Sequence, residues 1–518
     1  MSMREIELKL TLSEADIRAL AASPAFAELT GGKFTTRLLR SVYFDTPDGA
    51  LGREKISLRI RDTGESRIQT VKLDGGLTKG LSQTLEYENE IADDIPDLSL
   101  ISDGEVARRI EAVLAGVPPK PLFETHIERT AALIDIADEG TVELAIDIGD
   151  VRAGDKRAPL DEVELELKAG APFIMLSAAE KLFAGVAVTP SKLHKAQHGF
   201  SLIGLGEKEI SLAPAFSEKT EITRDMSGVE ALRSVGNAAV EQILRNWEFM
   251  HADPAPEGPH QLRVGLRRLR TALHMLNAKK LGPEFGALEE MAQRLAGVVG
   301  DLRDADVLLG DIYMPAADRF EEIPQCGALR DALTVHIAEK RKIVRESLLS
   351  ADWTQLKLSC LFFDFLIDRA LARAGAGAGF KDPKILKHAD KALGKAWRRV
   401  EKWGARIDEL TPEERHSMRK KLKSLRYVTE FFLPLYSAKK ATPFLKKLQR
   451  LQDIFGYLND VATSQQLLEI AANNEEAGEE ITSQAFLIHS WHLDRAEKAW
   501  QNARKSWKKL TKTERFWE

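Results

Sequence analysis

The spacing of apolar residues changes once along the 518-residue chain, and this change predicts two kinds of fold. From residue 3 to about 204, charged and apolar residues alternate, as in Glu5–Leu10 (EIELKL). Alternation with a period of two is typical of a β-strand with two different faces. From about 223 onward the apolar residues recur with helical spacing. We therefore expect an α+β chain with a β-rich domain at 1–204, a linker at 205–222 and an all-α domain at 223–510.

The β-rich part contains six clear alternating segments. These are Glu5–Leu10, Leu58–Arg61, Thr70–Leu73, Glu86–Ile91, Val142–Ile148 and Glu162–Lys168. Because Gly, Pro and Asp favour turns, we expect turns at Thr46–Gly49, Asp74–Gly76 and Ala169–Pro172. Short helical patterns lie at 13–29, 103–115 and 173–185.

Composition excludes several classes of protein. The 74 basic and 79 acidic residues give a net charge of −5, so the charge of the whole chain indicates no partner. Cys326 and Cys360 are too few for a disulfide framework or a cysteine zinc site, and we expect both to be buried thiols. The sequence shows neither a signal peptide nor a run of about 18 apolar residues. A cytoplasmic protein with no membrane contact is expected.

One face of each alternating segment carries both carboxylates and cations. A solvated sheet face would explain any one segment, but the recurrence on six segments favours a closed barrel with its charges turned inward. A buried interior of both signs is costly unless a metal ion and a polyanion neutralise it. Lys9, Arg59, Arg61 and Lys72 would then grip a phosphate chain. Glu5, Glu7, Glu164 and Glu166 would hold Mg²⁺ or Mn²⁺ through oxygen ligands.

The segment Glu5-x-Glu7-x-Lys9 resembles the signature of the CYTH, or triphosphate tunnel metalloenzyme, superfamily. Further segments of the family pattern follow in order: Tyr43–Asp48, Leu58–Arg61, Thr70–Lys72, Glu128–Arg129, Glu143 with Asp147, Glu162–Glu166 and Ser191–Lys195. The resemblance covers about residues 3–204. It implies an eight-stranded antiparallel β tunnel with flanking helices, and metal-dependent attack on a triphosphate.

The resemblance also implies a role for each matching residue. The implied metal ligands are Glu5, Glu7, Glu164 and Glu166, with Glu143 and Asp147 as helpers. The implied substrate-binding residues are Lys9, Arg59, Arg61, Lys72, Arg129 and Lys195, and those with a catalytic role are Lys195, Glu7 and Lys72. One metal ion would bridge the triphosphate and a second would position a water molecule. A single metal ion with a lysine-assisted water remains an open alternative.

Two positions depart from the family pattern. Thr84 stands where relatives often carry an arginine, and His198 stands where an arginine is expected near the end of the domain. Either change is expected to weaken the grip on substrate or to alter the pH dependence. His194 and His198 have the spacing of a helical zinc site, but the carboxylate-rich surroundings favour a hard cation.

The helical half repeats itself at a fixed offset of 156 residues. The motif His260, Arg263, Arg267, Arg270 recurs as His416, Arg419, Lys423, Arg426, and Leu302–Asp304 recurs as Leu458–Asp460. This indicates a duplicated helical bundle, with repeats at about 223–370 and 384–510 on either side of an Ala/Gly-rich stretch at 372–379.

Each repeated motif places its four residues on one face of a helix. One basic stripe is commonly a solvated surface, but two at equivalent places favour a shared positive groove for phosphate oxygens. No set of base-stacking aromatic residues accompanies the stripes, so nucleic acid is not expected as a partner.

The helical half resembles the CHAD domain, a histidine-bearing helical domain often joined to CYTH domains, and this resemblance implies polyphosphate binding. We therefore expect hydrolysis of inorganic triphosphate to pyrophosphate and phosphate in the barrel, and binding of long-chain polyphosphate by the helices. Two alternatives stay open: a polyphosphate-docking protein with little turnover, and adenylyl cyclase or thiamine triphosphatase activity of the same fold.

Overall fold

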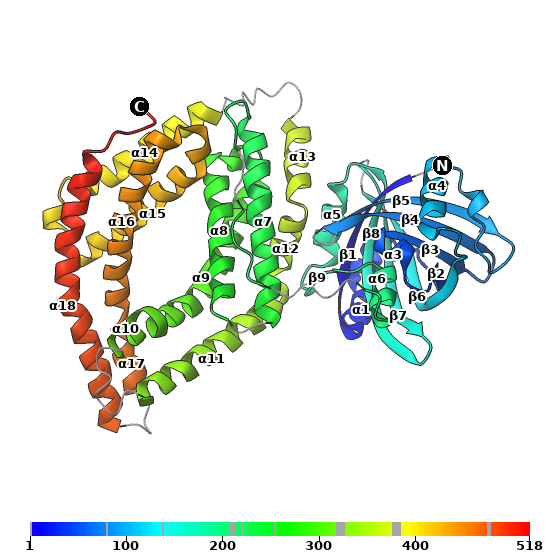
Figure 1. The fold of residues 1–518 in the computed structure, drawn as a ribbon, viewed down its shortest axis with the longest axis horizontal. Coiled ribbons are helices and arrows are strands. Elements are labelled where there is room, and N and C mark those ends of the chain that lie inside the picture. Colours follow the sequence, from blue (N-terminus) through cyan, green and yellow to red (C-terminus); the bar gives the residue numbers. More distant parts are fainter. Residues whose placement is uncertain are drawn as a thin grey trace. The chain divides into compact units, whose positions relative to one another are not determined.

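The computed structural model describes residues 3–78, 81–136, 139–206, 213–218, 222–252, 255–317, 327–374, 385–473 and 478–518. The chain forms two compact units (Figure 1): Met1–Ser211 with Leu349–Leu366, and Leu212–Leu348 with Ile367–Glu518. Cys326, parts of the expected linker 205–222 and most of the stretch 372–379 lie outside the described residues. Among the described helices, none combines the length and the apolar character needed to cross a membrane.

The first unit is a closed barrel of eight antiparallel strands. These are β1 (Met3–Thr11), β2 (Thr35–Asp45), β3 (Ile56–Asp62), β4 (Arg67–Thr78), β5 (Leu81–Ile91), β6 (Lys120–Ile136), β7 (Gly140–Ala153) and β8 (Lys156–Gly170). Their order is β5-β4-β3-β2-β6-β7-β8-β1, and β1 closes the barrel by pairing with β5. A short strand, β9 (Thr189–Pro190), pairs with β1. The predicted eight-stranded antiparallel tunnel is confirmed.

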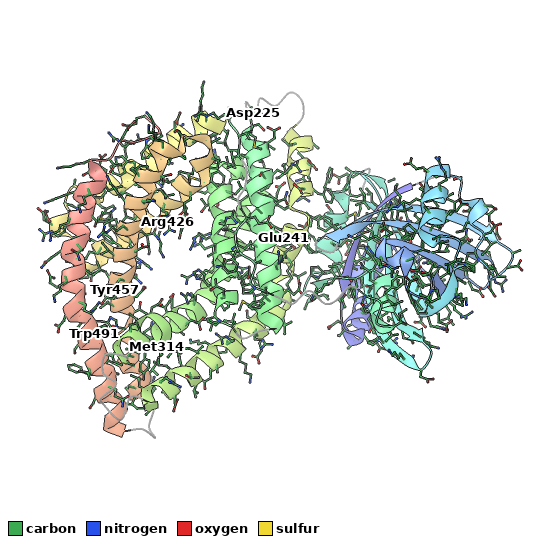
Figure 2. All side chains as sticks on the ribbon, in the orientation of Figure 1. Asp225, Glu241, Met314, Arg426, Tyr457 and Trp491 are labelled. Carbon is green, nitrogen blue, oxygen red and sulfur yellow. The ribbon has the colours of Figure 1, made fainter. Side chains whose placement is uncertain are left out.

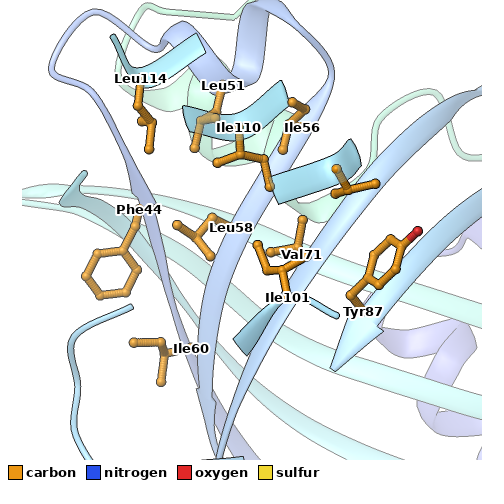
Figure 3. Close-up of a cluster of buried hydrophobic side chains, with 11 residues drawn as sticks. Phe44, Leu51, Ile56, Leu58, Ile60, Val71, Tyr87, Ile101, Ile110 and Leu114 are labelled. Carbon is orange, nitrogen blue, oxygen red and sulfur yellow. The ribbon is translucent and has the colours of Figure 1, made fainter. Parts of the chain in front are cut away.

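Helices pack around the barrel. They are α1 (Glu14–Ala21), α2 (Pro24–Thr30), α3 (Ala50–Arg53), η1 (Leu98–Leu100), α4 (Gly104–Leu114), α5 (Ile174–Leu182), α6 (Lys195–Leu202), η5 (Ala351–Trp353) and α12 (Thr354–Leu361). The outward residues Leu58 and Val71 join Leu51 of α3 and Ile110 of α4 in one apolar cluster (Figure 3). Helices α1, α2 and α5 contact β6, β7 and β8. The alternation of two therefore separates an apolar outer face from a charged inner one.

Two local expectations were wrong. The pattern at 13–29 forms two helices, because Ser23 caps a new helix and Pro24 occupies its first position. The turn expected at Asp74–Gly76 is absent, since β4 continues to Thr78. Its pairing with β5 resumes after a register shift between Asp74 and Leu77, so the extra residues form a bulge.

The described secondary structure of the second unit consists of helices joined by loops, with no strand among its described residues. Its elements are α7 (Gly228–Ala252), α8 (Glu257–Met275), η2 (Ala278–Lys280), α9 (Pro283–Val307), the π-helix η3 (Leu308–Tyr313), α10 (Met314–Ala317), α11 (Gly327–Leu349), α13 (Phe363–Ala374), α14 (Ile385–Gly404), η6 (Ile407–Glu409), α15 (Pro412–Phe432), η7 (Leu433–Leu435), α16 (Ala438–Thr463), α17 (Gln466–Ala472) and α18 (Gly478–Thr511). The two copies of the basic motif lie on α8 and α15, which contact each other.

Candidate active site and phosphate-binding surface

A cavity of about 920 Å³ lies inside the barrel, and all eight strands contribute to its lining. The lining includes the predicted residues Glu5, Glu7, Lys9, Arg59, Arg61, Lys72, Arg129, Glu143, Glu164, Glu166 and Lys195. Asp147 differs from these residues, because its side chain is fully buried behind Arg129 and Lys195 and does not line the cavity.

On one side of the cavity, Lys72 from β4 bridges two carboxylates. Its Nζ lies 2.8 Å from Glu5 and 3.0 Å from Glu86, and Arg59 lies 3.6 Å from Glu86. The hydroxyl of Thr84 donates to Glu5 at 3.0 Å, so this departure from the family pattern still contacts a predicted metal ligand. Burial alone would raise the pKa of Glu5, but Lys72 holds it below its usual range.

Glu164, on β8, is the centre of a second charged network. It pairs with Lys9, with Lys195 and, at 2.6 Å, with Arg129. Lys195 also lies 2.9 Å from Glu162 and 3.0 Å from Asp147. Burial alone would lower the pKa of Lys195, but Glu164 and Glu162 hold it well above its usual value. Lys195 is therefore an ammonium group and a hydrogen-bond donor.

Positive charge is in excess where Arg59 and Arg61 of β3 face Arg129 of β6. Burial, with the neighbouring Arg59 and Arg129, lowers the pKa of Arg61 to about 10. Within the described part of the chain, the buried Nε atoms of Arg59 and Arg61 have no hydrogen-bond partner. Donors of this kind are costly when unsatisfied, so this side of the tunnel is suited to an anion.

Negative charge is in excess where β1, β7 and β8 meet. Glu166 lies opposite both Glu7 and Glu143 in the strand register. Burial and Glu164 raise the pKa of Glu7, and burial and Glu5 raise the pKa of Glu166 to about 8. No three His, Cys, Asp or Glu residues of the described ranges are already grouped as a metal site. Lys9 pairs with Glu7, and Lys168 pairs with Glu143 and Glu166, but the carboxylates outnumber these two lysines, and their oxygen donors fit a hard divalent cation.

Several charged residues near the cavity were missing from the predicted set, among them Glu86, Glu88, Glu162 and Lys168. Glu162, only 2% exposed, accepts hydrogen bonds from Lys195 and from Ser191. The signal was present, because Glu162 and Lys168 share the inward face of β8 with Glu164 and Glu166, and Glu86 and Glu88 share the inward face of β5 with Thr84. His198 lies 3.9 Å from Glu162, and burial lowers its pKa.

In the second unit, the two basic stripes come together. Arg267 of α8 lies over the ring of Tyr427 of α15, with 4.2 Å between the guanidinium carbon and the ring centroid. The same ion pair occurs in both copies of the basic motif: Arg263 lies 3.2 Å from Asp304, and Arg419 lies 4.0 Å from Asp460. We call Arg263, Arg267, Arg419 and Lys423 the basic cluster.

The outer members of the stripes have polar partners. Arg270 donates to Gln293 at 3.0 Å, His416 lies 2.9 Å from Asn459, and Arg426 lies 2.6 Å from Glu430. The side chain of Arg426 is labelled in Figure 2. Burial and the nearby Arg303 lower the pKa of His260. In the described ranges, the buried Nε atoms of Arg267, Arg270 and Arg419 have no hydrogen-bond partner. The stripes therefore keep donors available for an anion.

Comparison with known proteins agrees with this division. The CYTH domain model matches residues 3–197, and the CHAD domain model matches residues 235–469. The inorganic triphosphatase of Haemophilus influenzae is 29% identical over 209 residues, which are 39% of this chain and 55% of that relative. This chain thus matches about half the length of that relative.

Two further matches cover the helical half. An uncharacterized protein of Mycobacterium tuberculosis is 24% identical over 531 aligned residues, which cover 99% of this chain and 97% of that protein. The crystal structure of the CHAD domain from the plant Ricinus communis matches with a TM-score of 0.50 and 25% identity. It covers 58% of this chain and 99% of that domain.

Proposed function

Because this chain joins a CYTH domain at residues 3–197 to a CHAD domain at residues 235–469, we propose that its barrel hydrolyses inorganic triphosphate to pyrophosphate and phosphate with a divalent metal ion. One observation carries the proposal: the tunnel has buried guanidinium donors without partners on one side and carboxylates of raised pKa on the other. A metal ion and a polyphosphate bound together would neutralise both sides.

The substrate is bound by the cationic side of the tunnel. Arg59, Arg61 and Arg129 offer guanidinium forks that match the paired oxygens of phosphate groups. Lys9 and Lys72 each lie between two carboxylates, and each can turn its ammonium group toward the phosphate groups of the substrate. A triphosphate spans several such donors at once, which favours it over a single phosphate.

Mg²⁺ or Mn²⁺ would be held by Glu5, Glu7 and Glu166, with Glu143 beside them. When bound, the ion supplies charge neutralisation and lowers the pKa of a coordinated water. Glu164 already binds three cationic side chains, so it becomes a ligand only when one of them turns to the substrate. We assign Asp147 to holding Arg129 and Lys195 in place, because it does not reach the cavity.

Lys195 acts as a donor at the reacting phosphate. In hydrolysis, the oxygen of water bonds to the terminal phosphorus, the bridging P–O bond breaks, and pyrophosphate leaves. The ammonium of Lys195, held by three carboxylates, orients the terminal phosphate or the water by donating a hydrogen bond. Lys72 stabilises the negative charge that develops on the leaving pyrophosphate.

The enzyme proposal is tested by measuring phosphate release by the purified chain with Mg²⁺ or Mn²⁺. Triphosphate, ATP, thiamine triphosphate and long-chain polyphosphate are compared side by side. We expect triphosphate to be preferred and EDTA to abolish turnover, because the acidic side loses its counter-ion. Formation of cyclic AMP from ATP would establish the cyclase alternative, and no turnover with tight polyphosphate binding would establish the docking alternative.

We further propose that the basic cluster binds long-chain polyphosphate, and this proposal predicts a pH dependence. Burial and the charges of Arg419, Arg267 and Arg263 lower the pKa of Lys423 to about 8, against the opposing effect of Asp460. A bound polyanion favours the charged lysine, so binding takes up a proton above pH 8. The affinity is expected to fall by up to about tenfold between pH 7 and pH 9.

Titration calorimetry in buffers of different ionisation enthalpy measures both the affinity and the proton uptake. The variant Lys423→Arg is the matched control, because arginine keeps its charge throughout this range. It should bind with the same affinity at pH 7 and pH 9. An equal fall in affinity for the wild type and this variant would contradict the assignment to Lys423.

A further inference from the structure

One helix encoded within the helical half of the sequence belongs to the barrel unit. Residues 349–366, which include α12, group with the barrel by their contacts, and α12 contacts α5. Seven of its eight residues are buried, with Gln355 the exception. Helix α12 begins more than 150 residues after the last residue that the CYTH model matches. Because it nevertheless belongs to the barrel unit, the contacts that it makes there indicate its role.

Three side chains of α12 donate hydrogen bonds, two to the segment that follows α5 and one to α5 itself. Thr354 donates to the carbonyl of Val186 at 2.6 Å, and Lys357 donates to the carbonyl of Val188 at 3.1 Å. Gln355 donates to the carboxylate of Glu180, on α5 itself, at 2.6 Å. The helix therefore fixes two backbone carbonyls immediately before β9.

The same segment is attached to the active site on its other side. Pro190 of β9 pairs with Leu10 of β1, and the next amide, that of Ser191, donates to the carbonyl of Lys9 at 3.0 Å. The Ser191 hydroxyl donates to Glu162 at 3.1 Å, and Glu162 in turn accepts from Lys195 at 2.9 Å. A continuous series of contacts thus connects α12 to the ammonium group of Lys195.

Lys357 is the residue of α12 that best indicates what the helix does. It is 5% exposed, and burial lowers its pKa to about 8. A methionine or leucine would fill the same space without the cost of burying an amine. The lysine adds a directed hydrogen bond to the backbone carbonyl of Val188, which an apolar side chain cannot make.

We propose that α12, through Lys357 and Thr354, is a positioning element for Lys195. It holds the segment at 186–191 in place, and this segment sets where Glu162 and Lys195 lie. Lys357 does not line the cavity, so it does not contact the substrate and is a positioning residue. The catalytic part of this inference rests on the proposed triphosphatase function, but the structural part does not.

The test compares Lys357→Met with wild type in the full chain. We expect the turnover number for triphosphate to fall about tenfold with KM changed less than about twofold, because a small misplacement of a catalytic group slows chemistry more than binding. Lys357→Arg keeps a donor and should restore most of the turnover. The matched control is Lys342→Met on α11, a lysine whose side chain is 77% exposed and which does not belong to the barrel unit.

Amide hydrogen exchange provides a readout that does not depend on the reaction. In Lys357→Met we expect faster exchange at Ser191 and in α6, with unchanged exchange in β2, β3 and β6. Unchanged exchange at Ser191 would overturn the inference, and so would equal losses in the Met and Arg variants with a lowered Tm. If wild type does not hydrolyse triphosphate, the proposed function fails, and the exchange data alone then decide whether α12 positions this segment.

Discussion

Replacing Glu7 by Gln is expected to reduce triphosphate turnover roughly a thousandfold while the barrel stays folded. The carboxylate is a proposed metal ligand, and losing about 4 kcal/mol of metal-derived stabilisation of the transition state corresponds to that factor. Folding should survive, because burial and Glu164 raise the pKa of Glu7 and so disfavour its charge in the folded protein. Phosphate release at saturating Mg²⁺, together with Tm, measures both effects.

The matched control is Glu111→Gln, on the exposed face of α4. It removes the same charge from the same domain without touching the tunnel, and it should keep full activity. Full activity in Glu7→Gln with its metal dependence intact would refute the assignment. A large fall in Tm would instead assign Glu7 to the stability of the barrel.

Replacing the whole basic cluster by alanine is expected to weaken binding of long-chain polyphosphate by about a hundredfold or more. Hydrogen bonds to charged groups contribute about 1.5–3 kcal/mol each, and shared contacts make their losses less than additive. The dependence of affinity on salt should also flatten, because fewer counter-ions are released from the polyanion. Fluorescence anisotropy with labelled polyphosphate at several salt concentrations measures both quantities.

A control variant that loses the same number of positive charges distinguishes a specific polyphosphate-binding site from non-specific electrostatic attraction. Replacing the exposed lysines Lys391, Lys395, Lys402 and Lys446 removes four positive charges from the same unit outside the cluster. This variant should bind nearly as tightly as wild type. Equal losses in the two variants would mean that net charge, not the cluster, attracts polyphosphate. Triphosphate turnover should be the same in both variants.

The direction of the barrel side chains could be predicted from the sequence, because it depends only on local alternation. Glu7 and Lys9 point inward because Leu8 between them points outward, and a period of two fixes this without any knowledge of neighbouring strands. The closure of β1 on β5 is different. It joins residues about 80 positions apart, and only the family resemblance indicated it.

The composition of the site was predictable, but its internal pairing was not. Asp147 and Glu143 share an inward face, yet Glu143 lines the cavity and Asp147 lies enclosed by Arg129 and Lys195. Which inward carboxylate faces open space depends on the lengths of side chains from other strands. For the same reason, the contact of Glu162 with Lys195 could not be read from its strand alone.

The place of α12 also could not be predicted, because its sequence has the helical character of the segments around it. Its hydrophobic residues gave no indication that they belong to the barrel unit. This placement has a consequence for synthesis on the ribosome. The eight strands are complete by residue 170, but Thr354 is added only after roughly 180 more residues, which takes on the order of ten seconds or more in bacteria. In a nascent chain, the segment at 186–191 therefore gains its contacts with α12 only after most of the first helical repeat has been translated.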